Sequence, residues 1–267
     1  MMSTTELVAV ARQRRASEGI FLGVSALLFA ASAAGTIYLC GTMSDGMEMP
    51  GGWTMSMAWM RMPGQSWALA ASAFLGMWVV MMTAMMMPSQ VPMLSRYRRA
   101  VAGTARLDLL TGVAGTGYFF VWSLFGIAIY LLGVTLATIE MQYPALARAV
   151  PIVAGAVVVA AGALQFTRWK SRHLGCCREM PARSCVLAPD AATAWRYGMR
   201  LGLHCSQCCA GPVAILLVLG VMDPLAMALV TGAITVERLT GERVGQTIGA
   251  AVVGAGLYLM GLAAGIG

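Results

Sequence analysis

Charged side chains are scarce in this sequence of 267 residues. Aspartate, glutamate, lysine and arginine make up 11% of it, against roughly a quarter of an ordinary soluble domain. Hydrophobic residues make up 59%. Apolar stretches of the length needed to cross a bilayer, about 20 residues each, recur along the whole chain and leave no room for a sizeable soluble domain. The composition therefore excludes a soluble protein and predicts a polytopic membrane protein.

Histidine is nearly absent, with two residues in the whole chain. No Ser/His/Asp arrangement and no glycine-rich loop that would cradle a phosphate is present. Hydrolytic catalysis therefore has few candidate residues, and the pattern favours a transporter or a metal chaperone over an enzyme.

Seven apolar segments are candidates for membrane-spanning helices: residues 19–40, 66–87, 109–138, 149–166, 201–222, 225–239 and 246–266. The sixth is short and follows the turn Asp223-Pro224, so it predicts a helical hairpin with the fifth, and a count of six stays open. We expect an all-α bundle of about seven transmembrane helices. Its parts are a cytoplasmic N-terminal segment (1–18) and one transmembrane domain (19–267), with a methionine-rich outer loop (41–65) and a Cys/Arg-rich inner loop (168–200).

Basic residues fall in alternate connections of this bundle. Sixteen of the 18 lie there, and only Arg61 and Arg148 lie in the intervening loops. The positive-inside rule assigns the arginine-rich side to the cytoplasm, with the N-terminus in and the C-terminus out. This predicts a multi-pass protein of the bacterial inner membrane with the lipid bilayer as a partner. No aromatic residues interleave these charges as single-strand binding needs, so nucleic acid is not an expected partner.

The seven cysteines do not indicate a disulfide framework. On this topology six of them face or adjoin the reducing cytoplasm, where thiols stay reduced. Cys40, at the outer end of the first span, is the exception.

Methionine is abundant where charge is not: fourteen of the 22 lie between Met43 and Met93. The outer loop holds Met43, Met47, Met49, Met55, Met57, Met60 and Met62. Several stand two apart, a spacing suited to an extended chain. The thioether is a soft, uncharged ligand that selects Cu(I) over hard cations.

The second span carries a methionine stripe. Met77, Met81 and Met85 are spaced i, i+4, i+8, and Met82 and Met86 form a parallel pair. Met87 and Pro88 are expected to end this helix. The stripe predicts a path for a soft cation; the alternative is a set of methionines that pack or face lipid.

The second motif is GLHCSQCC at the inner start of the fifth span, with His204, Cys205, Cys208 and Cys209. Three thiols and an imidazole are soft ligands for Cu(I), Zn(II) or an iron–sulfur cluster. The alternative is a buried structural trio. His173, Cys176 and Cys177 in the inner loop are, together with Cys185, either a second ligand set or surface thiols. Glu237 and Arg238, near the inner end of the sixth span, are expected to be an anchor or an ion pair.

The order of MMTAMMMPS, GLHCSQCC and VMDPLAMALVTGAITVERL resembles a bacterial family of predicted metal-binding integral membrane proteins, domain-of-unknown-function family 2182, over residues 66–239. The resemblance implies metal binding with no settled activity. Ala210 stands where that family has an aromatic residue, whereas Glu237-Arg238 fits its acidic-basic pair. Eukaryotic copper transporters of the Ctr type are similar in arrangement alone: methionines outside and across, cysteines inside.

These patterns favour a protein that binds and handles a soft metal, most simply Cu(I), with Zn(II) as the alternative ion. Outer methionines would collect Cu(I), the stripe would relay it, and the inner Cys/His motif would receive it for transport or for delivery to a copper protein. Two other hypotheses stay open: a membrane thiol–disulfide oxidoreductase using Cys205 and Cys208, and a structural subunit without metal. The oligomeric state is not fixed by the sequence.

Overall fold

The computed structural model describes residues 4–42, 46–61, 64–104, 106–179 and 188–265. In these residues it has eight α-helices, one 3-10 helix and one two-stranded sheet. In chain order they are α1 (Thr4–Thr42), β1 (Gly46–Met49), β2 (Trp53–Ser56), η1 (Met57–Trp59), α2 (Trp67–Ala100), α3 (Leu107–Gln142), α4 (Pro144–Leu164), α5 (Arg168–Glu179), α6 (Ala191–Leu219), α7 (Pro224–Thr240) and α8 (Glu242–Ala263). The all-α class is confirmed.

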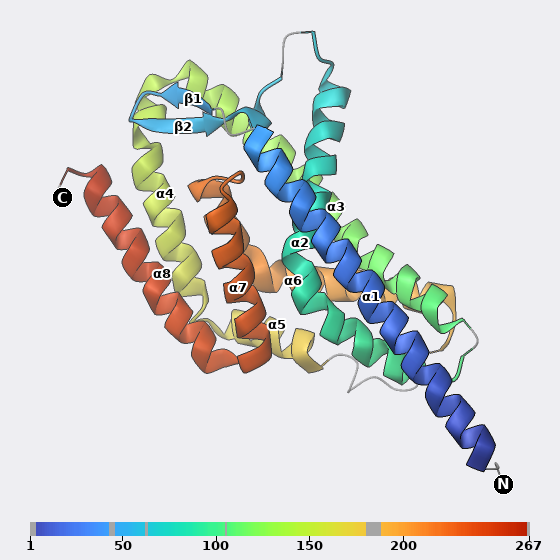
Figure 1. Cartoon of the computed structure of the whole chain (residues 1–267). Helices are drawn as coiled ribbons and strands as arrows, with labels where there is room; N and C mark the ends of the chain where they lie inside the picture. Colours follow the sequence, from blue (N-terminus) through green and yellow to red (C-terminus); the bar gives the residue numbers. More distant parts are fainter. Residues whose placement is uncertain (1–3, 43–45, 62–63, 105, 180–187, 266–267) are drawn as a thin grey trace.

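Six helices in the described part of the chain are long and apolar enough to cross a membrane: α1, α2, α3, α4, α6 and α8. The seventh candidate, α7, has 17 residues and is about 25 Å long at 1.5 Å per residue. It lies beside α8 within the bundle (Figure 1). The two termini lie at opposite ends of the bundle in the same view, with the C-terminus at the end that carries the β-hairpin.

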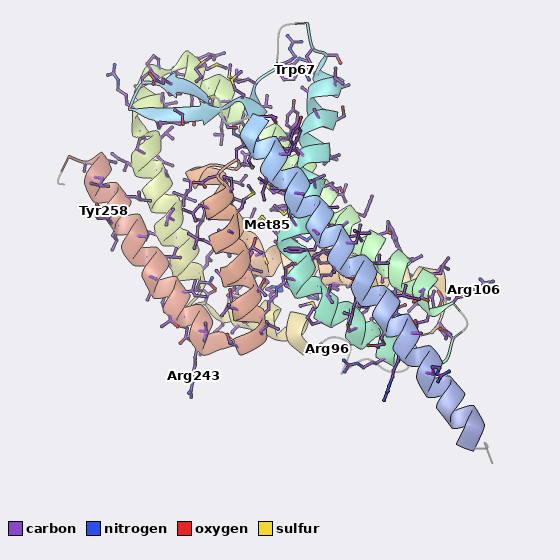
Figure 2. The ribbon with its side chains drawn as sticks, viewed as in Figure 1. Trp67, Met85, Arg96, Arg106, Arg243 and Tyr258 are labelled. Atoms are coloured by element: carbon purple, nitrogen blue, oxygen red, sulfur yellow. The ribbon has the colours of Figure 1, made fainter. Side chains whose placement is uncertain are left out.

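We call the two ends of the bundle the hairpin end, which carries β1 and β2, and the arginine end. Arg96, Arg106 and Arg243 lie away from Trp67, which begins α2 at the hairpin end (Figure 2). At the arginine end the predicted segment 1–18 is, from residue 4, the first part of α1. The predicted loop 168–200 contains α5 and about three turns of α6. Asp190 caps α6 by accepting hydrogen bonds from Thr193, which lower the pKa of Asp190.

Arg98 ties three helices together at the arginine end. Its side chain is 2% exposed and forms an ion pair with Asp108 of α3 at 2.8 Å. It also donates hydrogen bonds to the hydroxyls of Thr111 (3.2 Å) and Ser17 (2.6 Å). A single guanidinium with five donors can serve several acceptors, so α1, α2 and α3 are fixed relative to one another at the arginine end of the bundle.

Helix α2 does not end at Met87-Pro88, and the expectation that it would is wrong. It continues through Pro88 and Pro92 to Ala100. Proline is tolerated inside membrane helices when neighbouring helices pack around it. Here one face of the helix beyond Pro88 is buried, with Gln90 at 1% and Tyr97 at 0% exposed, so tertiary packing on both sides of the prolines holds the helix together.

Glycines let two helix pairs approach closely. Gly198 of α6 lies against the Ala114 carbonyl of α3, and Gly256 of α8 lies against Val159 and Gly155 of α4. Small residues let membrane helices approach closely, and Gly256 of the glycine-rich α8 does so. At Gly254 and Gly261, by contrast, a Cβ would have no neighbour within 4 Å among the described residues.

Gly256→Val should destabilise the bundle, because a Cβ at this position would lie 2.8 Å from the Val159 nitrogen. Overpacking of this kind costs about 1–3 kcal/mol. The loss is measured as a lower melting temperature of the purified protein in detergent. Gly254→Val is the matched control, since it makes the same change in helix propensity in the same helix without a clash. Equal melting temperatures for the two variants would contradict this account of the α4–α8 contact.

Candidate metal site

The methionines of the α2 stripe all face the interior of the bundle. Their side chains are between 0% and 7% exposed: Met77, Met81, Met82, Met85 and Met86. Met85 lies in the middle of the bundle (Figure 2). The lipid-facing alternative for these residues is therefore wrong. The thioethers of the stripe therefore lie in the protein interior.

The methionine stripe and the cysteine motif meet. The Met86 sulfur of α2 lies 3.9 Å from the Cys205 sulfur of α6. Both side chains are fully buried. Two sequence motifs whose contacting residues are 119 positions apart are thus parts of one site.

Cys205 is surrounded by polar groups from three helices. The Tyr118 hydroxyl of α3 lies 2.9 Å from its sulfur. Arg238 of α7 points one guanidinium nitrogen at two sulfurs, 2.8 Å from Cys205 and 3.2 Å from Cys209. The Cys205 and Cys209 side chains also hydrogen-bond to each other. The centre of the site is therefore a pair of thiols, with a thioether beside Cys205 and a cation facing both thiols.

Arg238 is 5% exposed, so its charge is buried. A buried charge is costly unless it is paired and hydrogen-bonded. Its second terminal nitrogen donates to the Ser89 hydroxyl of α2 at 3.0 Å. A thiolate at Cys205 or Cys209 would balance the guanidinium with a short, charge-assisted contact.

Glu237 pairs with a different residue from the neighbouring arginine. Its carboxylate lies 3.0 Å from the Lys170 ammonium of α5, and both side chains are buried. Lys170 also donates to the Cys208 carbonyl of α6. The expectation of an ion pair at Glu237 is confirmed, with a partner that the sequence did not indicate. This pair fastens α5 and α7 to the helix that carries the thiols.

The two histidines form a separate group. Nδ1 of His204 lies 3.4 Å from Nδ1 of His173 on α5, and the Trp169 ring packs on His173. Cys176, one turn further along α5, is exposed. In the described residues, no three His, Cys, Asp or Glu side chains converge as a metal-binding group. At the thiol site, the soft donors that come together are Cys205 and Cys209, with the Met86 thioether beside Cys205.

A soft-donor site inside a bundle of membrane helices agrees with what a family model shows. The model of PpoB2, described as a copper chaperone, matches residues 75–262. The chain belongs to the PpoB2 copper chaperone family. No curated protein and no solved structure matches the chain. The match covers α2 from Leu75 onward and nearly all of α8, and so includes every residue of the thiol site.

The methionines of the segment 41–65, which were expected to collect the ion, take different positions in the structure. Met49 and Met55 are buried at 8% and 2% exposure and pack with Ala137 and Ala147. Met47 faces Met55 across the hairpin and is 41% exposed. Met57 is half-buried in η1. Met43, Met62 and Cys185 lie outside the described residues, and nothing is described of the Cys177 side chain.

The hairpin is held on the bundle by Trp53, whose indole nitrogen donates to the Ala147 carbonyl at 2.9 Å. The extended conformation expected from methionines two apart is confirmed by β1 and β2. Two of these methionines therefore anchor the hairpin, and Met47 remains accessible.

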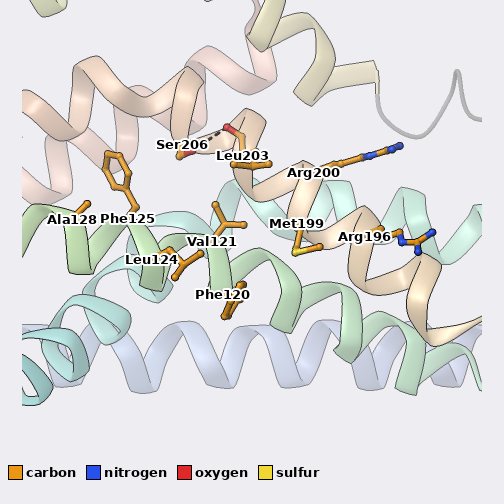
Figure 3. A pocket seen from close by; sticks show the side chains of 10 residues that line it. All are labelled: Phe120, Val121, Leu124, Phe125, Ala128, Arg196, Met199, Arg200, Leu203 and Ser206. Carbon is orange, nitrogen blue, oxygen red and sulfur yellow. Dashed lines mark hydrogen bonds between the residues drawn. The ribbon is translucent and has the colours of Figure 1, made fainter.

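An apolar groove of about 480 Å³ lies elsewhere, between α3 and α6 (Figure 3). Val121, Leu124 and Phe125 line it from α3, and Arg196 and Arg200 lie at one end. Met199 is its one thioether. With a single thioether, the groove has no cluster of soft donors, and it is distinct from the thiol site.

Sequence reasoning missed four contributors to the site: Tyr118, Lys170, Ser89 and the thiol contacts of Arg238. Tyr118 and Ser89 lie in apolar helices where nothing in the local pattern marks them. Arg238 carried a usable signal, because an arginine within a membrane span is expensive and faces a functional interior.

Lys170→Met should destabilise the protein, because it leaves the Glu237 carboxylate buried without its cation. Breaking a buried pair costs about 3–5 kcal/mol. The double variant Lys170→Met/Glu237→Leu should recover most of this loss. The quantity to measure is the melting temperature in detergent. Arg168→Met, an exposed change on the same helix, is the control; a Lys170→Met protein as stable as this control would refute the role of the pair.

Proposed function

We propose that this protein binds Cu(I) at Cys205, Cys209 and Met86 and delivers it to a partner copper protein. The observation that carries the proposal is the 3.9 Å contact between the Met86 and Cys205 sulfurs. It joins a buried row of thioethers to a pair of buried thiols. Soft thiolate and thioether ligands select Cu(I), and membership of a copper chaperone family supports the same ion.

The α2 stripe supports passage of Cu(I) toward the thiols. Methionines four residues apart on a helix are separated by a rise of about 6 Å. Each has three rotatable bonds through which its sulfur moves, so neighbouring thioethers can exchange an ion. A thioether carries no charge, and a thiolate does. Cu(I) therefore binds more tightly at Cys205 and Cys209 than along the stripe, and the gradient in affinity runs toward the arginine end.

Arg238 makes this site electrically suitable for a monovalent cation. Two thiolates and Cu(I) carry a net charge of −1, which the guanidinium balances. Before Cu(I) binds, a site with one thiol and one thiolate carries a charge of −1, which the Arg238 guanidinium balances as well. Uptake of one Cu(I) with release of one proton leaves the charge of the site unchanged. This exchange avoids the large cost of burying a net charge.

Burial disfavours the thiol–disulfide alternative. Cys205 and Cys208 are 0% and 2% exposed, whereas disulfide exchange needs a thiolate that can reach another sulfur. Redox trapping with an alkylating reagent separates the two functions: a Cys205–Cys208 pair that cycles to a disulfide in cells would favour the oxidoreductase. The hypothesis of a structural subunit without metal is tested by the copper content of the purified protein, and bound copper would contradict it.

The arginine end is proposed to face the cytoplasm of a bacterial inner membrane, by the positive-inside rule. The hairpin end, with Met47, then faces the outer space. Cu(I) enters at the hairpin end in this arrangement and reaches the thiols near the cytoplasmic face.

Cys205→Ser should weaken Cu(I) binding by at least about a hundredfold, because loss of a group that only supports a ligand already costs about 10–100-fold. Met86→Leu should weaken it by about tenfold. The dissociation constant is measured by anaerobic competition with a chromogenic Cu(I) chelator. Cys176→Ser and Met87→Leu are the controls, on an exposed thiol and on the neighbouring methionine.

The same titration in weak buffer should release about one proton per Cu(I), since thiols lose protons on metal binding. Unchanged affinity in Cys205→Ser would refute the thiol site. A different proton count with normal affinity would refute only the charge balance at Arg238.

Met82→Leu/Met85→Leu should slow Cu(I) transfer at least about tenfold and leave the affinity of the thiol site unchanged. Leucine conserves the volume of methionine at small cost in stability, so the change removes the sulfurs and little else. The rate is measured in proteoliposomes, with Cu(I) added at the hairpin side and a chelator on the other. The control is Met141→Leu, an exposed methionine of α3. A double variant that transfers at the control rate would refute the relay.

A further inference from the structure

A small cavity at the hairpin end is lined by sulfur. Its volume is about 10 Å³, and it lies where α1, α2 and the turn between α6 and α7 meet. The residues around it are Thr36, Leu39, Cys40, Met77, Met81 and Met222. Four of these six carry a soft donor atom. Two of the four, Cys40 and Met222, belong neither to the thiol site nor to the stripe.

The size of this cavity suits a single small guest. A space of about 10–15 Å³ is the least that holds one water molecule, and a buried water needs two to four polar partners. The Thr36 hydroxyl already donates to the Ser32 carbonyl at 2.8 Å. The remaining lining of thioethers and leucine gives water few hydrogen bonds, but it gives a soft cation several ligands.

Cys40 is 4% exposed, and no hydrogen bond to its thiol is formed by the described residues. Met77 and Met81 are 7% and 2% exposed. Close-packed interiors have few voids. A leucine in place of any of these methionines would have fewer rotatable bonds with which to fill the void or to move into it. Flexible thioethers around a void are instead able to close on a guest.

The location of the cavity gives it a role in the path. Cys40 lies in the last turn of α1, and Met77 and Met81 are the first two members of the α2 stripe. Met222 follows α6 directly before the Asp223 cap of α7. The cavity therefore stands at the hairpin end of the stripe, and the thiol site stands near the other end.

We propose that Cys40, Met77, Met81 and Met222 form a second Cu(I) site, which receives the ion before the stripe carries it to Cys205. The choice of Cu(I) rests on the proposed function; the site itself rests on the cavity. One thiolate, three thioethers and Cu(I) make a neutral group. This site therefore needs no counter-cation, whereas the two-thiolate site needs Arg238. Loading exchanges one Cu(I) for the proton of Cys40.

The test is an anaerobic titration of the full chain with Ag(I), a soft monovalent ion that does not change oxidation state. All proteins compared carry serine at Cys176, Cys177 and Cys185, so that these thiols do not contribute. The reference protein should bind two equivalents tightly. Cys40→Ser/Met222→Leu should lose one equivalent and keep the other, and Cys205→Ser/Cys209→Ser should do the same. Met227→Leu, a buried methionine of α7 away from the cavity, should bind two.

X-ray absorption of the Cys205→Ser/Cys209→Ser protein with one Ag(I) should show sulfur-only coordination. If Cys40→Ser/Met222→Leu still binds two Ag(I) tightly, the proposed site at Cys40 is overturned. The proposed function is unaffected by that result when Cys205→Ser/Cys209→Ser loses one equivalent. If Cys205→Ser/Cys209→Ser binds two equivalents and Cys40→Ser/Met222→Leu binds one, the thiol site is overturned and the site at Cys40 is supported. A circular dichroism spectrum and a melting temperature equal to those of Met227→Leu show that each variant is folded.

Discussion

The buried charge of Arg238 is the constraint on which the packing around the thiol site depends. A guanidinium cannot lose its proton inside a protein, so its surroundings have to supply acceptors. Cys205 and Cys209 from α6 and Ser89 from α2 do so. The requirement fixes the rotation of α7 about its axis and brings α2, α6 and α7 together at one depth. Helix α7 is short, but its position in the bundle is fixed because polar contacts hold it as well as packing.

The second buried pair, Lys170 with Glu237, extends this arrangement to α5. Glu237 and Arg238 are neighbours in sequence, yet each takes its partner from another helix. Two adjacent residues of α7 thus connect it to α5 and to the thiols in the interior. Lys170 and Glu237 form one neutral pair, and Arg238 is held by the sulfurs of Cys205 and Cys209 and the Ser89 hydroxyl. Of the four charged side chains that are buried in the described part of the chain, three lie around the cysteines of α6, and the fourth, Arg98, pairs with Asp108 of α3.

The sequence predicted the parts of this protein better than their contacts. Hydropathy located the membrane helices, because crossing a bilayer demands long apolar segments. The methionine stripe and the cysteines were identifiable because both residue types stood at helical spacing. The predicted end of α2 at Pro88 was wrong, since a proline ends a helix only where packing does not compensate for the lost hydrogen bond. The contact of Met86 with Cys205 had no local signal, because it depends on how α2 and α6 cross. The separation of His204 from the thiols likewise follows from where α5 lies.

The two prolines of α2 have a mechanical consequence. Proline has no N–H to give, so the carbonyls of Ala84 and Pro88, each one turn earlier, lose their usual helical donors. Both carbonyls lie within two residues of Met86. A helix that lacks two backbone bonds one turn apart bends there with less resistance than elsewhere. The stiffness of α2 is therefore lowest at the depth of the thiols, and a small flexion at this point changes the distance between the Met86 and Cys205 sulfurs while both ends of the helix stay in place.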